Sequence, residues 1–279
     1  MDGTDTESGV RRDHFALLVR DWSDFGPPLR PSPFDTAVVQ RAAAGLAQGP
    51  RVVVLGLTPE TIGCTWPDGT GLLALDHSAA MLGAVWPQPG APAGSSAVLA
   101  NWLKMPLADG SVDIVCGDGC HTQVPYPRGY TALSAEVHRV LKPGGRFVTR
   151  VFMRPEQPEP LEAIASALAA GRIKSVHALK LRLLAALHGH SGIGSCMDDA
   201  WRAWKRLPDL PRGMALQRGW TRQEVVGIEN YAGLATRYYL PTLGELRAFH
   251  ATRFIEIECR YGDYELAERC PTLVLERRG

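Results

Sequence analysis

The 279-residue chain has little excess charge and no long apolar run. Its formal net charge of +1 gives no bulk attraction to nucleic acid or to an anionic membrane. No stretch of eighteen apolar residues occurs, so a membrane-spanning helix is not expected. Residues 1–15 are polar and lack the apolar core of a secretory signal. These absences predict a cytoplasmic protein with no nucleic-acid or membrane partner.

Two patterns that bind phosphates are also missing. GxxxxGK[ST] occurs nowhere, which excludes the usual nucleoside triphosphate loop. The apolar run Arg51–Leu55 is followed by Gly56, but then by LTPE instead of further glycines. Pro59 lacks an N–H donor, and Glu60 would repel a phosphate group. A dinucleotide-dependent oxidoreductase, which would use NAD(P), is therefore the less favoured alternative.

The six cysteines are too scattered for a disulfide framework, and we expect free thiols. Cys116, Cys120 and His121 give the spacing C-x-x-x-C-H, whereas haem attachment requires C-x-x-C-H. Residues 188–199 contain histidine, cysteine and aspartate, but their spacing matches no closed zinc site. We expect no bound metal.

What the chain does contain is an alternation of short apolar strands and helices over residues 37–152. The expected helices cover 36–49, with Asp35 as N-cap, then 78–86 and 128–141. The expected strands are 51–55, 71–76, 96–101, 112–118 and 146–152, with a turn over 142–145. This alternation predicts a parallel sheet covered by helices on both faces.

Three further regions complete the expected organisation. Residues 1–36 form an N-terminal segment with a cap helix. Residues 153–235 are expected to be a helical insertion, with twelve Lys or Arg against eight Asp or Glu over 151–240. Residues 236–279 return to strand at 236–240 and then supply a closing helix and a strand pair.

A ligand site is expected outside the carboxyl ends of the parallel strands. Gly56 follows the first strand, and Asp76 ends the second, twenty residues further on. An acidic residue at that distance typically accepts hydrogen bonds from a ribose. Asn101-Trp102 follows the third strand and offers an amide and an aromatic face to a purine. With Asp118-Gly119 at the fourth strand, these residues predict a nucleoside site whose tail is not a pyrophosphate.

The segments MPLADGSVDIV (105–115) and HRVLKPGGRFV (138–148) resemble class I S-adenosylmethionine-dependent methyltransferases. The resemblance covers about Ala37–Phe152 and the closing helix–strand–strand unit. It implies an α/β, Rossmann-like sheet of seven strands with the last strand antiparallel. It also implies methyl transfer, with S-adenosylmethionine as cofactor. The resemblance does not cover the helical insertion after the fifth strand, which we expect to form a lid over the reacting groups.

The resemblance assigns roles to individual residues. Gly56, Leu57 and Thr58 would line the methionine part of the cofactor, and Asp76 would hold the ribose hydroxyls. Asp118 and Gly119 would close the site beside the methionine amine. The adenine would be contacted by His77, Met81, Asn101, Trp102 and Leu103. The glycine-poor loop looks like a variant in which the Thr58 hydroxyl and Pro59 replace what glycines otherwise provide.

The acceptor is expected to be a small molecule. Oxygen is the first choice of acceptor atom and nitrogen the second, because the [ND]PP[YF] motif of N-methylating enzymes is missing after the fourth strand. His121 is the candidate general base, and Arg30, Arg150 and Arg154 are candidates for binding an acidic substrate. A non-catalytic cofactor-binding protein or partner subunit stays open as an alternative, and the pattern gives no oligomeric state.

Overall fold

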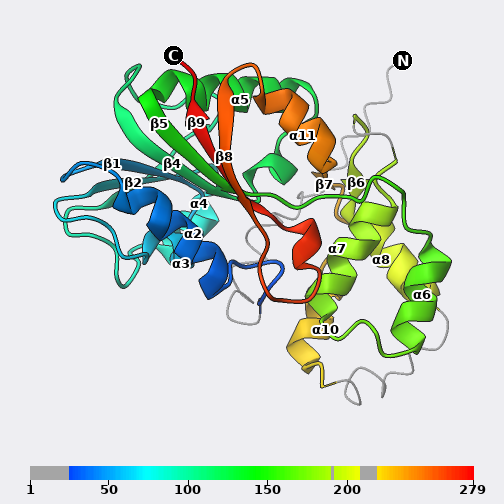
Figure 1. Ribbon diagram of the computed structural model, residues 1–279. Coiled ribbons are helices and arrows are strands. Elements are labelled where there is room, and N and C mark those ends of the chain that lie inside the picture. The colour runs from blue at the N-terminus through cyan, green and yellow to red at the C-terminus, as the bar shows by residue number, and fades with distance from the viewer. Residues whose placement is uncertain (1–24, 190–191, 208–218) are drawn as a thin grey trace, which may run out of the picture.

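The computed structural model describes residues 25–189, 192–207 and 219–279. Its centre is a seven-stranded sheet of order β3-β2-β1-β4-β5-β9-β8, shown in Figure 1. β9 runs antiparallel to both of its neighbours, whereas the pairs from β3 to β5 are parallel. This confirms the expected sheet with an antiparallel last strand. The strands are β1 (Arg51–Leu55), β2 (Gly71–Asp76), β3 (Ser96–Leu99), β4 (Val112–Asp118), β5 (Leu141–Arg150), β8 (Phe254–Arg260) and β9 (Thr272–Arg277).

The central strand β1 fixes where the carboxyl ends of its neighbours lie. Its β-branched valines favour the extended backbone, and Val52–Leu55 are each at most 2% exposed. Leu55 pairs with Leu75 in β2 and with Gly117 in β4. This register brings the ends of three strands to one edge of the sheet. The residues just after β1, β2 and β4 are therefore neighbours in space.

Alternate residues of β1 face opposite helical layers. Val52 and Val54 pack in the core that α2 (Pro33–Ala44), α3 (Pro59–Ile62) and α4 (Ala79–Val85) cover. The core on the other face lies beneath α5 (Arg128–Val140) and α11 (Leu243–His250). Figure 1 shows these two layers on either side of the sheet.

The sequence misplaced two local features of this domain. Ser32, not Asp35, is the N-cap of α2; Asp35 sits at the third helical position and completes a capping box with Ser32. Residues 142–145 are part of β5 rather than a separate turn. The β4–β5 register shifts there, with Val112 opposite Leu141 but Ile114 opposite Arg146, so the extra residues bulge from the strand.

Between β5 and α11 the chain forms a helical cluster with its own apolar core. Figure 1 shows this cluster beside the sheet, with the loop between β8 and β9 reaching towards it. A strand pair of two residues each, β6 (Ser195–Cys196) with β7 (Arg237–Tyr238), is shorter than the strand expected over 236–240. The helices are α6 (Leu161–Ala169), α7 (Val176–Ala186), α8 (Met197–Arg206) and α10 (Arg222–Glu229).

All six cysteines are free thiols. Within the described ranges, none of the helices combines the length and apolar character that crossing a membrane requires. The expected N-terminal helix before residue 25 lies outside the described residues.

Candidate functional site

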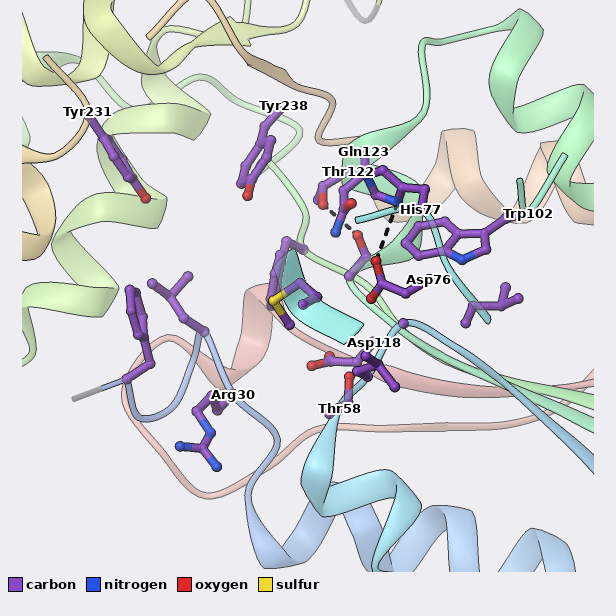
Figure 2. A pocket seen from close by; sticks show the side chains of 18 residues that line it. Arg30, Thr58, Asp76, His77, Trp102, Asp118, Thr122, Gln123, Tyr231 and Tyr238 are labelled. Carbon is purple, nitrogen blue, oxygen red and sulfur yellow. Dashed lines mark hydrogen bonds and ion pairs between the residues drawn. The ribbon is translucent and has the colours of Figure 1, made fainter. Parts of the chain in front are cut away.

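A pocket opens at the carboxyl ends of β1, β2 and β4 (Figure 2). It holds about 850 Å³ of space, its open mouth included, which suits a small ligand or cofactor. Ten residues singled out from the sequence line it: Arg30, Gly56, Leu57, Thr58, Asp76, His77, Met81, Trp102, Asp118 and Gly119.

The loop after β1 shows why one glycine is enough. Gly56 has φ +95°, a conformation that other residues adopt only at a cost, and its N–H donates to the Leu75 carbonyl at 2.7 Å. Thr58 then begins α3 as its N-cap, and Pro59 occupies the first helical position, where its missing N–H costs nothing. The chain enters a helix with ordinary backbone angles, so it needs no second glycine.

Asp76 presents a carboxylate to the pocket from the end of β2. The side chain is 5% exposed, and its Oδ1 accepts a hydrogen bond from the Ser78 N–H at 2.8 Å. Burial raises the pKa of Asp76, while the N–H groups of Ser78, His77 and Leu57 oppose that rise. A fixed, desolvated carboxylate of this kind accepts hydrogen bonds from hydroxyl groups strongly.

Trp102 forms a rigid aromatic wall beside this carboxylate. Its indole Nε1 donates to the Leu75 carbonyl at 2.6 Å, and its ring meets the His77 ring edge-to-face at 5.0 Å. A Cβ added at Gly56 would lie 3.9 Å from the Trp102 ring and 4.0 Å from Asp76 Oδ2. A side chain at position 56 would therefore contact both Trp102 and Asp76. A planar base can pack against the Trp102 ring.

Asp118 lies at the pocket in a buried ion pair with Arg150. Arg150 Nε donates to Asp118 Oδ1 at 2.6 Å, and Nη2 donates to Oδ2 at 3.1 Å. Burial raises the pKa of Asp118, and the Arg150 guanidinium acts against that rise. Gly119 has φ +63°, and an added Cβ would come within 2.9 Å of the Phe152 ring. The close approach and the backbone angle together require glycine here.

Arg150 does not face the pocket as a substrate-binding cation, contrary to the sequence expectation. It is 3% exposed, and besides Asp118 its guanidinium donates to the Pro28 carbonyl at 2.6 Å. The side chain turns back from the end of β5 to neutralise Asp118. Its hydrogen bond to Pro28 links the segment before α2 to the end of β5.

Three other expected residues do not line the pocket. Asn101 is exposed, and its Oδ1 accepts the Leu103 N–H at 2.9 Å. This turn holds the Asn101 amide against the local backbone. Neither Asn101 nor Leu103 lines the pocket. Arg154 donates to Glu245 Oε1 at 2.7 Å at the start of α11.

The structure places His121, which the sequence suggested as a general base, in the core and not at the pocket. It is 1% exposed and lies in the core, with its Nε2 3.1 Å from Nε2 of His250 and its ring against Tyr130 and Phe147. Burial, and then the nearby His250, hold its pKa well below the usual value. The turn after β4 points this side chain inward, away from the pocket.

The two buried histidines predict a loss of stability in acid. Burial lowers the pKa of His250 from 6.5 to about 4. Between those values the unfolded chain binds a proton that the folded chain does not, so the free energy of unfolding falls as pH drops, by about 1.4 kcal/mol per pH unit for each such histidine. Urea unfolding from pH 7 to 4 measures this slope. His250→Gln should make it shallower, and an unchanged slope would contradict the assignment.

The sequence missed several residues that line the pocket. Thr122 and Gln123, in the 3-10 turn Cys120–Gln123, follow β4, and Phe152 follows β5. All three lie within five positions of a strand end, so inspecting five positions beyond each strand would have found them. Phe25, Leu29, Tyr231 and Tyr238 also line the pocket, and the two tyrosines come from the helical cluster and its strand. No motif marks these four positions.

Among the described residues, no group of three His, Cys, Asp or Glu side chains could hold a metal ion. The pocket residues do suit a nucleoside with a cationic tail. They offer a buried carboxylate beside an aromatic wall, and they lack a turn of several N–H groups for phosphates.

Comparison with protein families gives one match. Residues 63–149 match the model of a family described as a methyltransferase domain. This range contains β2 to β4, α5 and most of β5, and it begins after the loop at Gly56. No curated protein matches the sequence.

Solved structures share the fold at low sequence identity. A Bradyrhizobium japonicum N-methyltransferase, NodS, in complex with S-adenosylhomocysteine has a TM-score of 0.54 and 11% identity, over 95% of this chain and 99% of that one. A Rhodobacter sphaeroides protein described as a Zn-dependent alcohol dehydrogenase has a TM-score of 0.57 and 13% identity, over 95% and 98%.

A Haloferax volcanii protein, described as a methyltransferase and seen in complex with the Trm112 methyltransferase activator, has a TM-score of 0.53 and 15% identity, over 97% of this chain and 98% of that one. At these identities the structures bear on the fold alone, while the family match bears on the chemistry. The methyltransferase-domain match over residues 63–149 and the seven-stranded sheet with β9 antiparallel together support an S-adenosylmethionine-dependent methyltransferase.

Proposed function

We propose that this enzyme methylates a small-molecule acceptor, at oxygen in the first place and nitrogen in the second, beneath the helical cluster. The observation that carries the proposal is the composition of the pocket. Asp76, Trp102 and the loop at Gly56 form one side, and Tyr231 and Tyr238 from the helical region form another. Figure 2 shows the tyrosines across the pocket from Asp76 and Trp102.

The cofactor side would hold S-adenosylmethionine through four contacts. The Asp76 carboxylate would accept the ribose hydroxyls, and Trp102 and Met81 would pack on the adenine. The Gly56–Thr58 loop would line the methionine part. Asp118, held in place by Arg150, would accept a hydrogen bond from the methionine amine. Bound S-adenosylmethionine supplies a methyl group on a positively charged sulfur.

The helical cluster would act as a lid. Residues 153–235 include Tyr231 at the pocket, and Phe152 links β5 to this region. Covering the pocket excludes water and holds an acceptor close to the methyl group, which is the main need of a displacement at carbon. A lid that closes over a pocket of this size favours a small acceptor over a macromolecular one.

A catalytic enzyme that needs a partner subunit is the second candidate. The Haloferax neighbour in complex with an activator matches almost the whole of this chain, which favours testing for a partner. In that case the isolated protein would bind S-adenosylmethionine but would transfer few methyl groups without its partner.

The test is where labelled methyl groups go. The protein is incubated with [methyl-³H]S-adenosylmethionine and either the small-molecule or the macromolecular fraction of a cell extract. We expect label in a small product, at least tenfold above an Asp76→Ala control, because losing the ribose contacts removes about 3 kcal/mol or more of binding. Label only in acid-precipitable material would contradict the small-molecule proposal. Transfer that requires the macromolecular fraction, with label still in a small product, would favour a partner.

A further inference from the structure

Six of the pocket residues that take no part in the proposed cofactor contacts form what we call the acceptor half. It consists of Phe25, Thr122, Gln123, Phe152, Tyr231 and Tyr238. Four of these six side chains are aromatic, and they come from three separate parts of the chain. Such a lining recognises a flat apolar body and selects it by ring stacking.

The rings of the acceptor half already have cations near them. Lys180 Nζ lies 5.0 Å from the Phe25 ring centroid and 5.9 Å from that of Tyr231. The Arg150 guanidinium lies 5.0 Å from the Phe152 ring centroid. A second cation beside these rings would be repelled by the first, so this is not a cage for a quaternary ammonium group. An uncharged, electron-rich ring suits these faces better.

The two arginines near the acceptor half, Arg30 and Arg150, are each paired with a carboxylate. Arg30 donates from Nε to Glu60 Oε1 at 2.6 Å, and Asp118 is paired with Arg150 at the same distance. An acidic acceptor would therefore have to compete with a carboxylate for either arginine. The arrangement favours a neutral acceptor over the acidic one that the sequence suggested.

Gln123 supplies the polar contact. It ends the 3-10 turn after β4 and lines the pocket beside Thr122, as Figure 2 shows. Its amide Oε1 is buried and has no hydrogen-bond partner among the described residues. A buried carbonyl oxygen left without a donor costs about 1–3 kcal/mol, which a ligand N–H or O–H would recover. Thr122 cannot supply that donor, because its hydroxyl donates to the Gly119 carbonyl.

We propose that the acceptor is a neutral aromatic molecule whose ring hydroxyl or N–H donates to Gln123 Oε1 while its ring packs against Tyr231 and Tyr238. This inference rests on the proposed function and adds the chemical class of the acceptor. In the reaction, the acceptor's lone pair forms the bond to the methyl carbon, the electrons of the carbon–sulfur bond stay on sulfur, and the acceptor's proton is released to bulk solvent as the product leaves. Gln123 orients the acceptor and takes no proton.

Four small probes test the proposal on the full chain saturated with S-adenosylhomocysteine. Phenol carries a ring and a donor, fluorobenzene a ring only, cyclohexanol a donor only, and tetramethylammonium a positive charge. Ligand-observed NMR titrations give the dissociation constants. We expect phenol to bind about tenfold more tightly than fluorobenzene and about tenfold more tightly than cyclohexanol, from one lost hydrogen bond and one lost ring contact respectively. Tetramethylammonium should not compete with phenol.

Two variants assign these preferences to residues. Gln123→Leu should make phenol and fluorobenzene bind equally, and Tyr238→Leu should reduce the preference of phenol over cyclohexanol by about fivefold. Tyr239→Phe is the matched control, because this neighbouring tyrosine packs in the sheet core and does not line the pocket. It should leave all four constants unchanged.

The affinity for S-adenosylhomocysteine is measured first for each protein. Suppose that S-adenosylhomocysteine binds but the protein binds phenol no more tightly than fluorobenzene and cyclohexanol, or that the Gln123→Leu variant still binds phenol more tightly than fluorobenzene. Either result would show that the acceptor class is wrong while the proposed function stands. If S-adenosylhomocysteine itself does not bind to the folded wild-type protein, both fail.

Discussion

Replacing Arg150 with methionine should lower the free energy of unfolding by about 3–5 kcal/mol. The change leaves the buried Asp118 carboxylate without its partner and removes the hydrogen bond to the Pro28 carbonyl. Methionine fills a similar volume, so the loss reports on the charge rather than on a cavity. Urea unfolding followed by tryptophan fluorescence measures it.

Two further variants make this result specific. Arg150→Met combined with Asp118→Asn should recover part of the loss, because the second change removes the unpaired charge. Arg247→Met breaks a pair with Glu256 in which the arginine side chain is 48% exposed, and it should cost at most about 1 kcal/mol. A loss below about 1 kcal/mol for Arg150→Met would contradict the structural role and return Arg150 to the candidates for substrate binding.

Replacing Asp76 with alanine should weaken S-adenosylhomocysteine binding at least 100-fold. Two hydrogen bonds to a charged acceptor are worth about 1.5–3 kcal/mol each, and alanine removes both. Asp76→Asn, which keeps one acceptor oxygen, should have an intermediate effect. Titration calorimetry measures both constants, and thermal unfolding shows whether each variant is folded, since Oδ1 also accepts the Ser78 N–H at the start of α4.

Asn101→Ala is the matched control for this series. Sequence and resemblance placed Asn101 at the adenine, but the structure places its side chain outside the pocket. We expect a change in affinity below threefold. If Asn101→Ala abolished binding while Asp76→Ala left it within threefold of the wild type, the assignment of the cofactor side would be wrong.

The sheet could be predicted because its strands carry their own signals. The β-branched runs at Arg51–Leu55 and Val112–Asp118 mark β1 and β4, and Asp76 follows from counting along β2. Such signals are local, so the strands can be predicted without knowing which residues pack against them. The same reasoning predicted that Gly56, Asp76 and Asp118 would meet, because parallel strands end at one edge.

The errors concern where side chains point, which packing decides. His121 follows β4 as the strand-end rule requires, but its turn directs the ring into the core against His250, a residue 129 positions away. Arg150 also lies at a strand end, but its guanidinium forms an ion pair with Asp118 on the neighbouring strand instead of facing the pocket. Tyr231 and Tyr238 reach the pocket only because the helical cluster returns to the sheet. These partners are distant in sequence, so no spacing reveals them.

The most direct test of the cofactor assignment is a calorimetric titration of the unmodified protein with S-adenosylhomocysteine, with NAD as the comparison. We expect S-adenosylhomocysteine to bind at one site with a micromolar dissociation constant and NAD to give no heat, because the loop after β1 holds no turn for a pyrophosphate. Binding of NAD by the folded protein, with none of S-adenosylhomocysteine, would contradict this assignment.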